Sequence, residues 1–274
     1  MDDTIGRWTN SRQRWLQRAT ATGISGLVLA LLVVLVTVAA AANKTPPAEL
    51  TEQWQPLPPV VSVAADGVPS DAIVLFDGGD LDAWTALPPD SPGWKTENGA
   101  MLVVPDAGDV RTKQAFGSIQ LHLEWRSPAK TEGVGQARGN SGVFFMGLYE
   151  LQVLDSYRSQ TYVNGQAASI YKQYAPLVNA SRPPGEWQSL DAMFIAPTFS
   201  PDGALISAAR MTVLHNGVLV QHDTPLRGAT VFRGQPGYTA HAAKLPLQLQ
   251  DHGQPVAFRN IWVREIAPAA FTDG

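Results

Sequence analysis

Residues 139–157, "GNSGVFFMGLYELQVLDSY", combine a turn signal with an apolar strand that carries polar side chains. The opening Gly-Asn-Ser-Gly should bend the chain, because these residue types favour turns. In the "YELQVL" that follows, Tyr149, Leu151 and Val153 alternate with Glu150 and Gln152. Alternate residues of a strand point to opposite sides. The stretch therefore predicts a β-strand with one apolar face and one polar face.

The same pattern of short apolar runs between turns continues from residue 72 onward. The runs are "AIVLF", "AMLVV", "IQLHLEWR", "GVFFM", "YELQVL", "MTVLHNGVLV", "LPLQLQ" and "VAFRNIWVREI". Within them "HNG" at residues 215–217 is a strong hairpin signal. Few segments beyond residue 43 keep a helical period, so the sequence predicts an all-β fold, an antiparallel β-sandwich.

The N-terminus differs from the rest of the chain. Four arginines at positions 7, 12, 14 and 18 precede an uncharged run over residues 24–42. Cations flanking an apolar run predict that this flank stays cytoplasmic and that the remainder is exported. Residues 1–23 are then a basic cytoplasmic segment, and residues 24–42 are either a retained inner-membrane anchor or a cleaved signal peptide. We expect a Pro-rich linker over residues 43–71 and the sandwich over residues 72–268, in the periplasm.

Composition restricts the partners of this domain. The chain has 20 Lys+Arg against 24 Asp+Glu and no basic stripe, which argues against a nucleic acid partner and favours a small molecule. Without cysteine there is no disulfide, thiolate zinc site or cysteine nucleophile. The five histidines lack the spacing of a helical zinc site, and no cofactor motif is evident. A calcium ion held by carbonyl and Asp oxygens stays open, although no loop indicates it.

Three of the predicted strands carry polar faces of similar composition. These faces hold Gln120, His122, Glu124 and Arg126, then Glu150 and Gln152, and finally Gln248, Gln250 and His252. Such faces are either solvated or ligand-binding. The strands contain no lysine, and planar amides and carboxylates make paired hydrogen bonds with sugar hydroxyls, so we favour a sugar-binding face.

Asp155 does not fit the alternation and should point into the core. Either a β-bulge turns it to the polar face, as often occurs beside active sites, or the strand ends at Leu154 and Asp155 begins a turn.

Seven motifs in order resemble the 3-keto-disaccharide hydrolase family, also described as 3-keto-glucoside 1,2-lyase/3-keto-2-hydroxy-glucal hydratase. They are "SDAIVLFDGGDLDAW", "LHLEWR", "GNSGVFF", "YELQVLDS", "GEWQ", "HNG" and "LQDHGQPVAFRNIWV", within residues 72–266 approximately. The resemblance implies a concanavalin A-like jelly roll, similar to that of laminarinase-type glycosidases. In those glycosidases the catalytic strand reads Glu-x-Asp-x-x-Glu, whereas here Glu150, Gln152 and Asp155 fill the same spacing.

The family's chemistry starts with removal of the C2 proton of a 3-keto glycoside, followed by β-elimination and hydration. It needs a base, a group that stabilises the enolate and a proton donor. We expect Glu150 or His252 to be the base and the other to be the acid. Arg126 or Arg259 is the candidate that stabilises the enolate. Asp155 either orients His252 or serves as the acid. The candidates for sugar binding are Glu124, His122, Asn140, Gln152, Gln250, Tyr171 and Trp187.

Several alternatives stay open on the sequence alone. Tyr171, Trp187, His252 and Arg259 could each have a structural role instead. The domain could be a double-displacement glycoside hydrolase, a non-catalytic carbohydrate-binding module or an envelope scaffold.

Overall fold

The computed structural model describes residues 30–31, 33, 48–130 and 132–266. The chain divides into two units, residues 1–60 and 61–274. The described part of the first unit contains one 3-10 helix, η1 (Ala48–Thr51). The expected anchor or signal peptide over residues 24–42 lies almost entirely outside the described residues and stays a prediction. Within the described ranges no helix is both long and apolar enough to cross a membrane.

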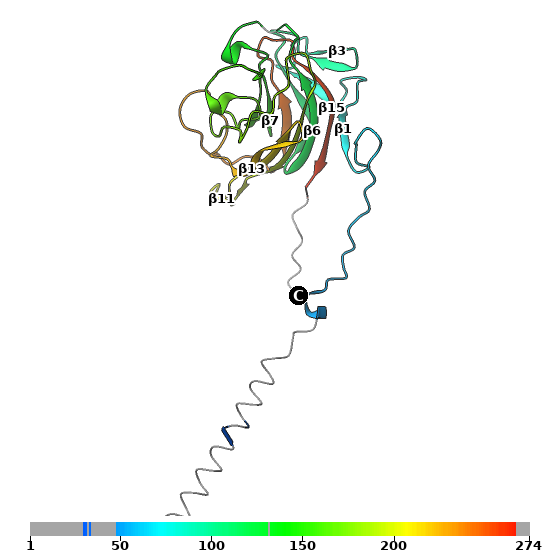
Figure 1. Ribbon diagram of the computed structural model, residues 1–274, viewed down its shortest axis with the longest axis vertical. Coiled ribbons are helices and arrows are strands. Elements are labelled where there is room, and N and C mark those ends of the chain that lie inside the picture. The colour runs from blue at the N-terminus through cyan, green and yellow to red at the C-terminus, as the bar shows by residue number, and fades with distance from the viewer. Residues whose placement is uncertain (1–29, 32, 34–47, 131, 267–274) are drawn as a thin grey trace, which may run out of the picture. The chain divides into compact units, whose positions relative to one another are not determined.

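The second unit is a sandwich of two antiparallel sheets, which confirms the predicted all-β class (Figure 1). The eight-stranded sheet has the order β13 (Val218–Pro225), β12 (Arg210–His215), β9 (Gln188–Ile195), β6 (Ile119–Arg126), β15 (Ala257–Glu265), β4 (Ala100–Leu102) and β3 (Lys95–Glu97), and β1 (Ile73–Phe76) also pairs with β15. The five-stranded sheet has the order β2 (Trp84–Leu87), β5 (Asp109–Phe116), β14 (Leu245–Leu249), β7 (Ser141–Phe145) and β8 (Tyr149–Val153). A separate pair is formed by β10 (Thr198–Phe199) and β11 (Leu205–Ser207), and two further 3-10 helices are η2 (Gly135–Ala137) and η3 (Val163–Gly165).

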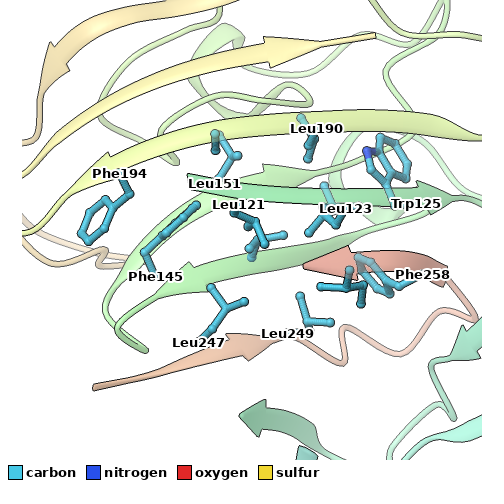
Figure 2. Close-up of a cluster of buried hydrophobic side chains, with 14 of the residues drawn as sticks. Leu121, Leu123, Trp125, Phe145, Leu151, Leu190, Phe194, Leu247, Leu249 and Phe258 are labelled. Carbon is cyan, nitrogen blue, oxygen red and sulfur yellow. The ribbon is translucent and has the colours of Figure 1, made fainter. Parts of the chain in front are cut away.

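The apolar faces of the two sheets pack against each other to form the core. In β6 burial alternates strictly, and Leu121, Leu123 and Trp125 are at most 1% exposed. They face Leu247 and Leu249 of β14 in the other sheet (Figure 2). Because each sheet turns its apolar side inward, its polar side faces away from the partner sheet.

The "HNG" turn is where the sequence predicts it. Asn216 and Gly217 link β12 to β13 with φ values of 52° and 77°. A two-residue type I′ hairpin turn requires a positive φ at both central positions, and its twist matches that of the strands it joins. Asn and Gly are the residues that adopt this conformation most readily.

The edge strand β8 is covered rather than open. All five of its residues are buried. The segment after it folds back along its free edge, where the Tyr171 N–H donates to the Glu150 carbonyl and the Ala168 N–H donates to the Gln152 carbonyl. Four elements therefore lie side by side in the order β14, β7, β8 and residues 168–171.

Candidate active site

A cavity of about 760 Å³ lies on the outer side of the five-stranded sheet, over β7 and β8. The strands contribute Phe144, Glu150 and Gln152 to its lining, and Gln250 and His252 follow the end of β14. Loops supply the remaining walls, which are Gln136, Ala137, Asn140, Tyr162, Tyr171, Lys172, Thr230 and Phe232. Among the described residues that line this cavity, Glu150 is the only carboxylate.

The Glu150 side chain is almost completely buried, with 4% of the residue exposed. Its carboxylate has no hydrogen bond from the described residues, although its backbone N–H donates to Thr230 Oγ1 at 3.0 Å. Burial raises the pKa of Glu150 to about 8, and the nearby charge of Asp109 adds to the increase. An acid with this pKa can both accept and release a proton near neutral pH.

Room for the Glu150 carboxylate comes from a glycine on the neighbouring strand. Gly142 pairs with Gln152 across β7 and β8, and a Cβ added to Gly142 would lie 2.8 Å from Glu150 Oε1 and 3.3 Å from Gln250 Oε1. The ends of Glu150 and Gln250 therefore converge above this glycine. A side chain at position 142 would occupy the same space.

Gln152 and Asn140 are held by side-chain hydrogen bonds at one end of the cavity. Gln152 Nε2 donates to Gln136 Oε1 at 2.9 Å, and Asn140 Nδ2 donates to the Gln136 carbonyl at 2.7 Å. Gln152 Oε1 is buried and has no partner among the described residues. A free acceptor in this position can receive a hydrogen bond from a ligand hydroxyl.

Two tyrosines and a lysine form another part of the wall. The hydroxyls of Tyr162 and Tyr171 are 2.6 Å apart, and burial is the main cause that raises the pKa of Tyr171. Lys172 Nζ donates to the Phe232 carbonyl at 2.6 Å and lies 4.0 Å from the centre of the Phe232 ring. Flat aromatic rings and hydroxyls of this kind suit a sugar ring.

The structure brings together six of the residues predicted for the site. They are Glu150, Gln152, Asn140, Gln250, His252 and Tyr171. The polar face of β8 that carries Glu150 and Gln152 is not freely solvated, because both residues are buried and loop residues such as Thr230 line the cavity above them.

Asp155 begins a turn and does not lie in a β-bulge, because β8 ends at Val153. This is the second of the two alternatives that the sequence left open for Asp155. Its side chain accepts hydrogen bonds from the Tyr157 N–H at 3.2 Å and from Arg138 Nε at 2.9 Å. It is 1% exposed and does not line the cavity. Its position outside the cavity lining argues against a role as acid, and the prediction that Asp155 orients His252 stays a prediction.

The other predicted residues lie on the opposite side of the molecule, which corrects their assignment to one face with Glu150. Strand β6 belongs to the eight-stranded sheet, so His122, Glu124 and Arg126 point away from the five-stranded sheet. Alternation shows which residues of a strand share a face, but it does not show to which sheet the strand belongs.

On that opposite face these residues bind one another. Arg259 Nε donates to Glu124 Oε2 at 2.7 Å, and the guanidinium groups of Arg259 and Arg126 lie 4.1 and 4.6 Å from the centre of the Trp187 ring. His122 Nδ1 lies 2.7 Å from Asp191 Oδ1. Arg126 and Arg259 therefore cannot stabilise an enolate formed beside Glu150.

Sequence reasoning missed the loop residues of the cavity, chiefly Gln136, Tyr162, Lys172, Thr230 and Phe232. They follow no periodic pattern and lie up to 96 positions apart in the chain (232 − 136). The four tyrosines at positions 157, 162, 171 and 174 are the one signal that could have pointed to this wall. No group of three or more His, Asp or Glu that could hold a metal occurs in the part of the chain that the structure describes.

A buried acid among amides, a histidine and aromatic rings, on a face of a β-sandwich, defines a carbohydrate-active enzyme or binding domain. Comparison with known proteins agrees. The profile of the 3-keto-alpha-glucoside-1,2-lyase-like domain matches residues 71–264, and the chain belongs to this family. The match includes every strand of both sheets except the last residue of β15.

Solved structures with the same fold come from Parabacteroides distasonis. One, provisionally assigned as a glycosyl hydrolase, shares 46% sequence identity over 80% of this chain and 97% of its own, with a TM-score of 0.77. A second with the same assignment shares 19% identity over 72% of this chain and 94% of its own, with a TM-score of 0.51, and supports the fold alone. No curated protein matches the chain.

Proposed function

We propose that this domain cleaves 3-keto glycosides by removal of the C2 proton, β-elimination and hydration. The observation that carries the proposal is Glu150, a buried acid without an ion-pair partner and the only carboxylate among the described cavity residues. A retaining glycosidase needs a second carboxyl about 5–5.5 Å away. Proton abstraction next to a ketone needs one base, so the cavity fits elimination better than double displacement.

The order of elements across the sheet suggests a role for each side chain. Glu150 on β8 lies between Gln250 and His252 at the end of β14 and Tyr171 beyond β8. We place the C2 hydrogen at Glu150, the C3 oxygen towards Gln250 and His252, and the C1 leaving group towards Tyr171. In this arrangement the N–H groups of Gln250 and His252 stabilise the enolate oxygen.

The reaction then balances without an additional reagent. The Glu150 carboxylate takes the C2 proton, and the electron pair of that C–H bond forms the enolate. When the enolate collapses, the C1–C2 double bond forms and the C1–O bond breaks, while Tyr171 gives its hydroxyl proton to the departing oxygen. Water adds its oxygen to C1 and one proton to Tyr171, and Glu150 returns its proton to C2. The sum is hydrolysis to the free 3-keto sugar.

We further propose that the domain works outside the inner membrane. This proposal is supported by the arginines before the apolar run over residues 24–42. N-terminal sequencing of the mature protein after cell fractionation tests it, since export with cleavage removes the run and an anchor retains it. Recovery of the protein in the cytosolic fraction would contradict the proposal.

The activity is tested with both anomers of 4-nitrophenyl 3-keto-glucoside and the purified full chain. Release of nitrophenol is expected, and the Glu150→Gln variant should lose at least ~100-fold in kcat. Glu124→Gln is the matched control, because Glu124 is a carboxylate of the opposite sheet that pairs with Arg259. Its rate should stay within a few-fold of the wild type.

Isotopes separate elimination from displacement. A substrate deuterated at C2 should react more slowly, because the C2–H bond breaks during elimination and stays intact during displacement at C1. Enzyme-free incubations correct for spontaneous exchange next to the ketone. Turnover by Glu150→Gln within a few-fold of wild type would remove Glu150 from the mechanism. Binding of the sugar without cleavage would instead indicate a carbohydrate-binding module.

A further inference from the structure

A second cavity of about 440 Å³ adjoins the one that contains Glu150. The two share four lining residues, Tyr162, Tyr171, Lys172 and Phe232. These residues belong to the side of the Glu150 cavity that lies beyond β8. The second cavity therefore continues from the wall where the proposed function places the leaving group.

The second cavity is positively charged. Lys172 and Arg227 line it, and none of its described lining residues is a carboxylate. Neither cation belongs to a salt bridge among the described residues, whereas Arg138, Arg210, Arg259 and Arg264 elsewhere in the sandwich each pair with an acid. Lys172 and Arg227 therefore present two cations to one cavity with no acid among its described lining residues to neutralise them.

Arg227 is held in place by contacts that leave its charge unneutralised. Its backbone N–H donates to Gln173 Oε1 at 2.7 Å, and Gln173 Nε2 donates to the Gly228 carbonyl at 3.0 Å. The guanidinium carbon lies 4.8 Å from the centre of the Tyr174 ring. Gln173 is 6% exposed, so a buried amide fixes the backbone from which the exposed Arg227 side chain extends.

We propose that this second cavity binds the leaving group of the substrate and favours a leaving group that carries a carboxylate. The assignment rests on the proposed cleavage of 3-keto glycosides. Lys172 stands at the junction of the two cavities, and Arg227 provides the positive charge beyond it. An arginine on an aromatic ring presents its N–H donors in a fixed plane, which suits the two oxygens of a carboxylate.

The test compares two leaving groups that differ in charge but not in the acidity of the phenol. These are the 3-keto-glucosides of 4-hydroxyphenylacetate and of 4-hydroxyphenylacetamide, in which a methylene group insulates the phenol from the substituent. Wild-type kcat/KM should be higher for the carboxylate by about fivefold, the effect of one partly exposed ion pair. The ratio should decrease at high salt, because counterions screen exposed charges.

Arg227→Gln should reduce that ratio to about one, and Arg227→Lys should keep part of it. Lys113→Gln is the control, because Lys113 is an exposed cation on β5 outside both cavities and the change in net charge is the same. If both glucosides are cleaved equally well by the wild type, the charge assignment is wrong and the proposed activity stands. If neither is cleaved, the activity and the assignment fail together.

Discussion

The carboxylate of Glu150 occupies the space that a side chain on Gly142 would fill. The distance from Glu150 Oε1 to an added Cβ would be 2.8 Å, and Phe144 Cε2 would be only 2.9 Å away. The backbone of Gly142 does not have a positive φ, so another residue could adopt its conformation. Glycine is needed at this position because the space beside it is filled by Glu150 and Phe144.

Gly142→Ala should therefore displace Glu150 while leaving the strand intact. We expect kcat for a 3-keto glucoside to decrease by about 100-fold, the effect of moving a catalytic group by roughly 1 Å. Gly79→Ala is the control, because Gly79 lies in a turn remote from the cavity, where an added Cβ meets only Asp77 Oδ1 at 3.2 Å. Equal rates for wild type and Gly142→Ala would show that the position of Glu150 does not limit turnover.

The pH dependence of activity follows from the pKa of Glu150. A base must be deprotonated to act, and the pKa of Glu150 is raised to about 8. We expect kcat/KM to increase about tenfold per pH unit below this value and to level off above it. Stopped assays between pH 5 and 9 measure the profile. A plateau that begins near pH 5 would mean that Glu150 is not the base.

Glu150 should also make the fold less stable as the pH rises. Its pKa is about 8 in the folded state against an ordinary value of 4.5, so the folded state binds the proton more tightly than the unfolded chain. The contribution of Glu150 to stability is complete below pH 4.5 and declines between pH 4.5 and 8. Each unit of difference corresponds to about 1.4 kcal/mol in the free energy of unfolding. Urea unfolding at pH 5 and pH 8 measures the free energy of unfolding of the wild type and of Glu150→Gln. The wild type should lose more stability between the two pH values than the variant, which has no carboxyl at position 150.

His215 should have the opposite pH dependence. It is 1% exposed and stacks on Trp125 with ring centres 6.1 Å apart, and burial lowers its pKa to about 4. The unfolded chain takes up a proton near pH 6.5 and the folded protein does not, so stability is complete above 6.5 and is lost as the pH falls towards 4. In urea unfolding, His215→Phe should lack this loss, whereas the exposed His222→Gln should keep it. An unchanged loss in His215→Phe would assign the acid sensitivity to another group.

Asp155 and Arg138 should stabilise the fold without contributing to catalysis. Their side chains are 2.8 Å apart, and that of Asp155 is 1% exposed. Asp155→Asn should lower the free energy of unfolding by about 3 kcal/mol, because it leaves Arg138 without its counter-charge. Asp223→Asn, which removes an exposed pair with Arg210, should have a much smaller effect.

The same Asp155 variant also tests the mechanism. Folded Asp155→Asn should retain kcat within a few-fold, because Asp155 does not line the cavity. A loss as large as that of Glu150→Gln would support double displacement with Asp155 as the second carboxyl.

Local features of the fold were predictable because they depend on neighbouring residues. Alternation in "IQLHLEWR" separates buried Leu123 from partly exposed Glu124, and "HNG" forms the expected turn. The choice between two roles for Asp155 was not predictable, since it depends on Arg138, which is 17 positions earlier in the chain.

For the site, the amino-acid sequence alone determined that Glu150 and Gln152 lie on the polar side of their strand with Leu151 on the other. Only the tertiary structure decided which other polar side chains share that side. Glu124 and Glu150 each lie on the polar side of a strand, but pairing over long distances assigns the two strands to different sheets. Glu124 consequently meets Arg259 near solvent, whereas loops from residues 136, 162–172 and 230–232 cover Glu150. Burial without a counter-charge, which no local pattern encodes, raises the pKa of Glu150 and separates a candidate base from a surface ion pair.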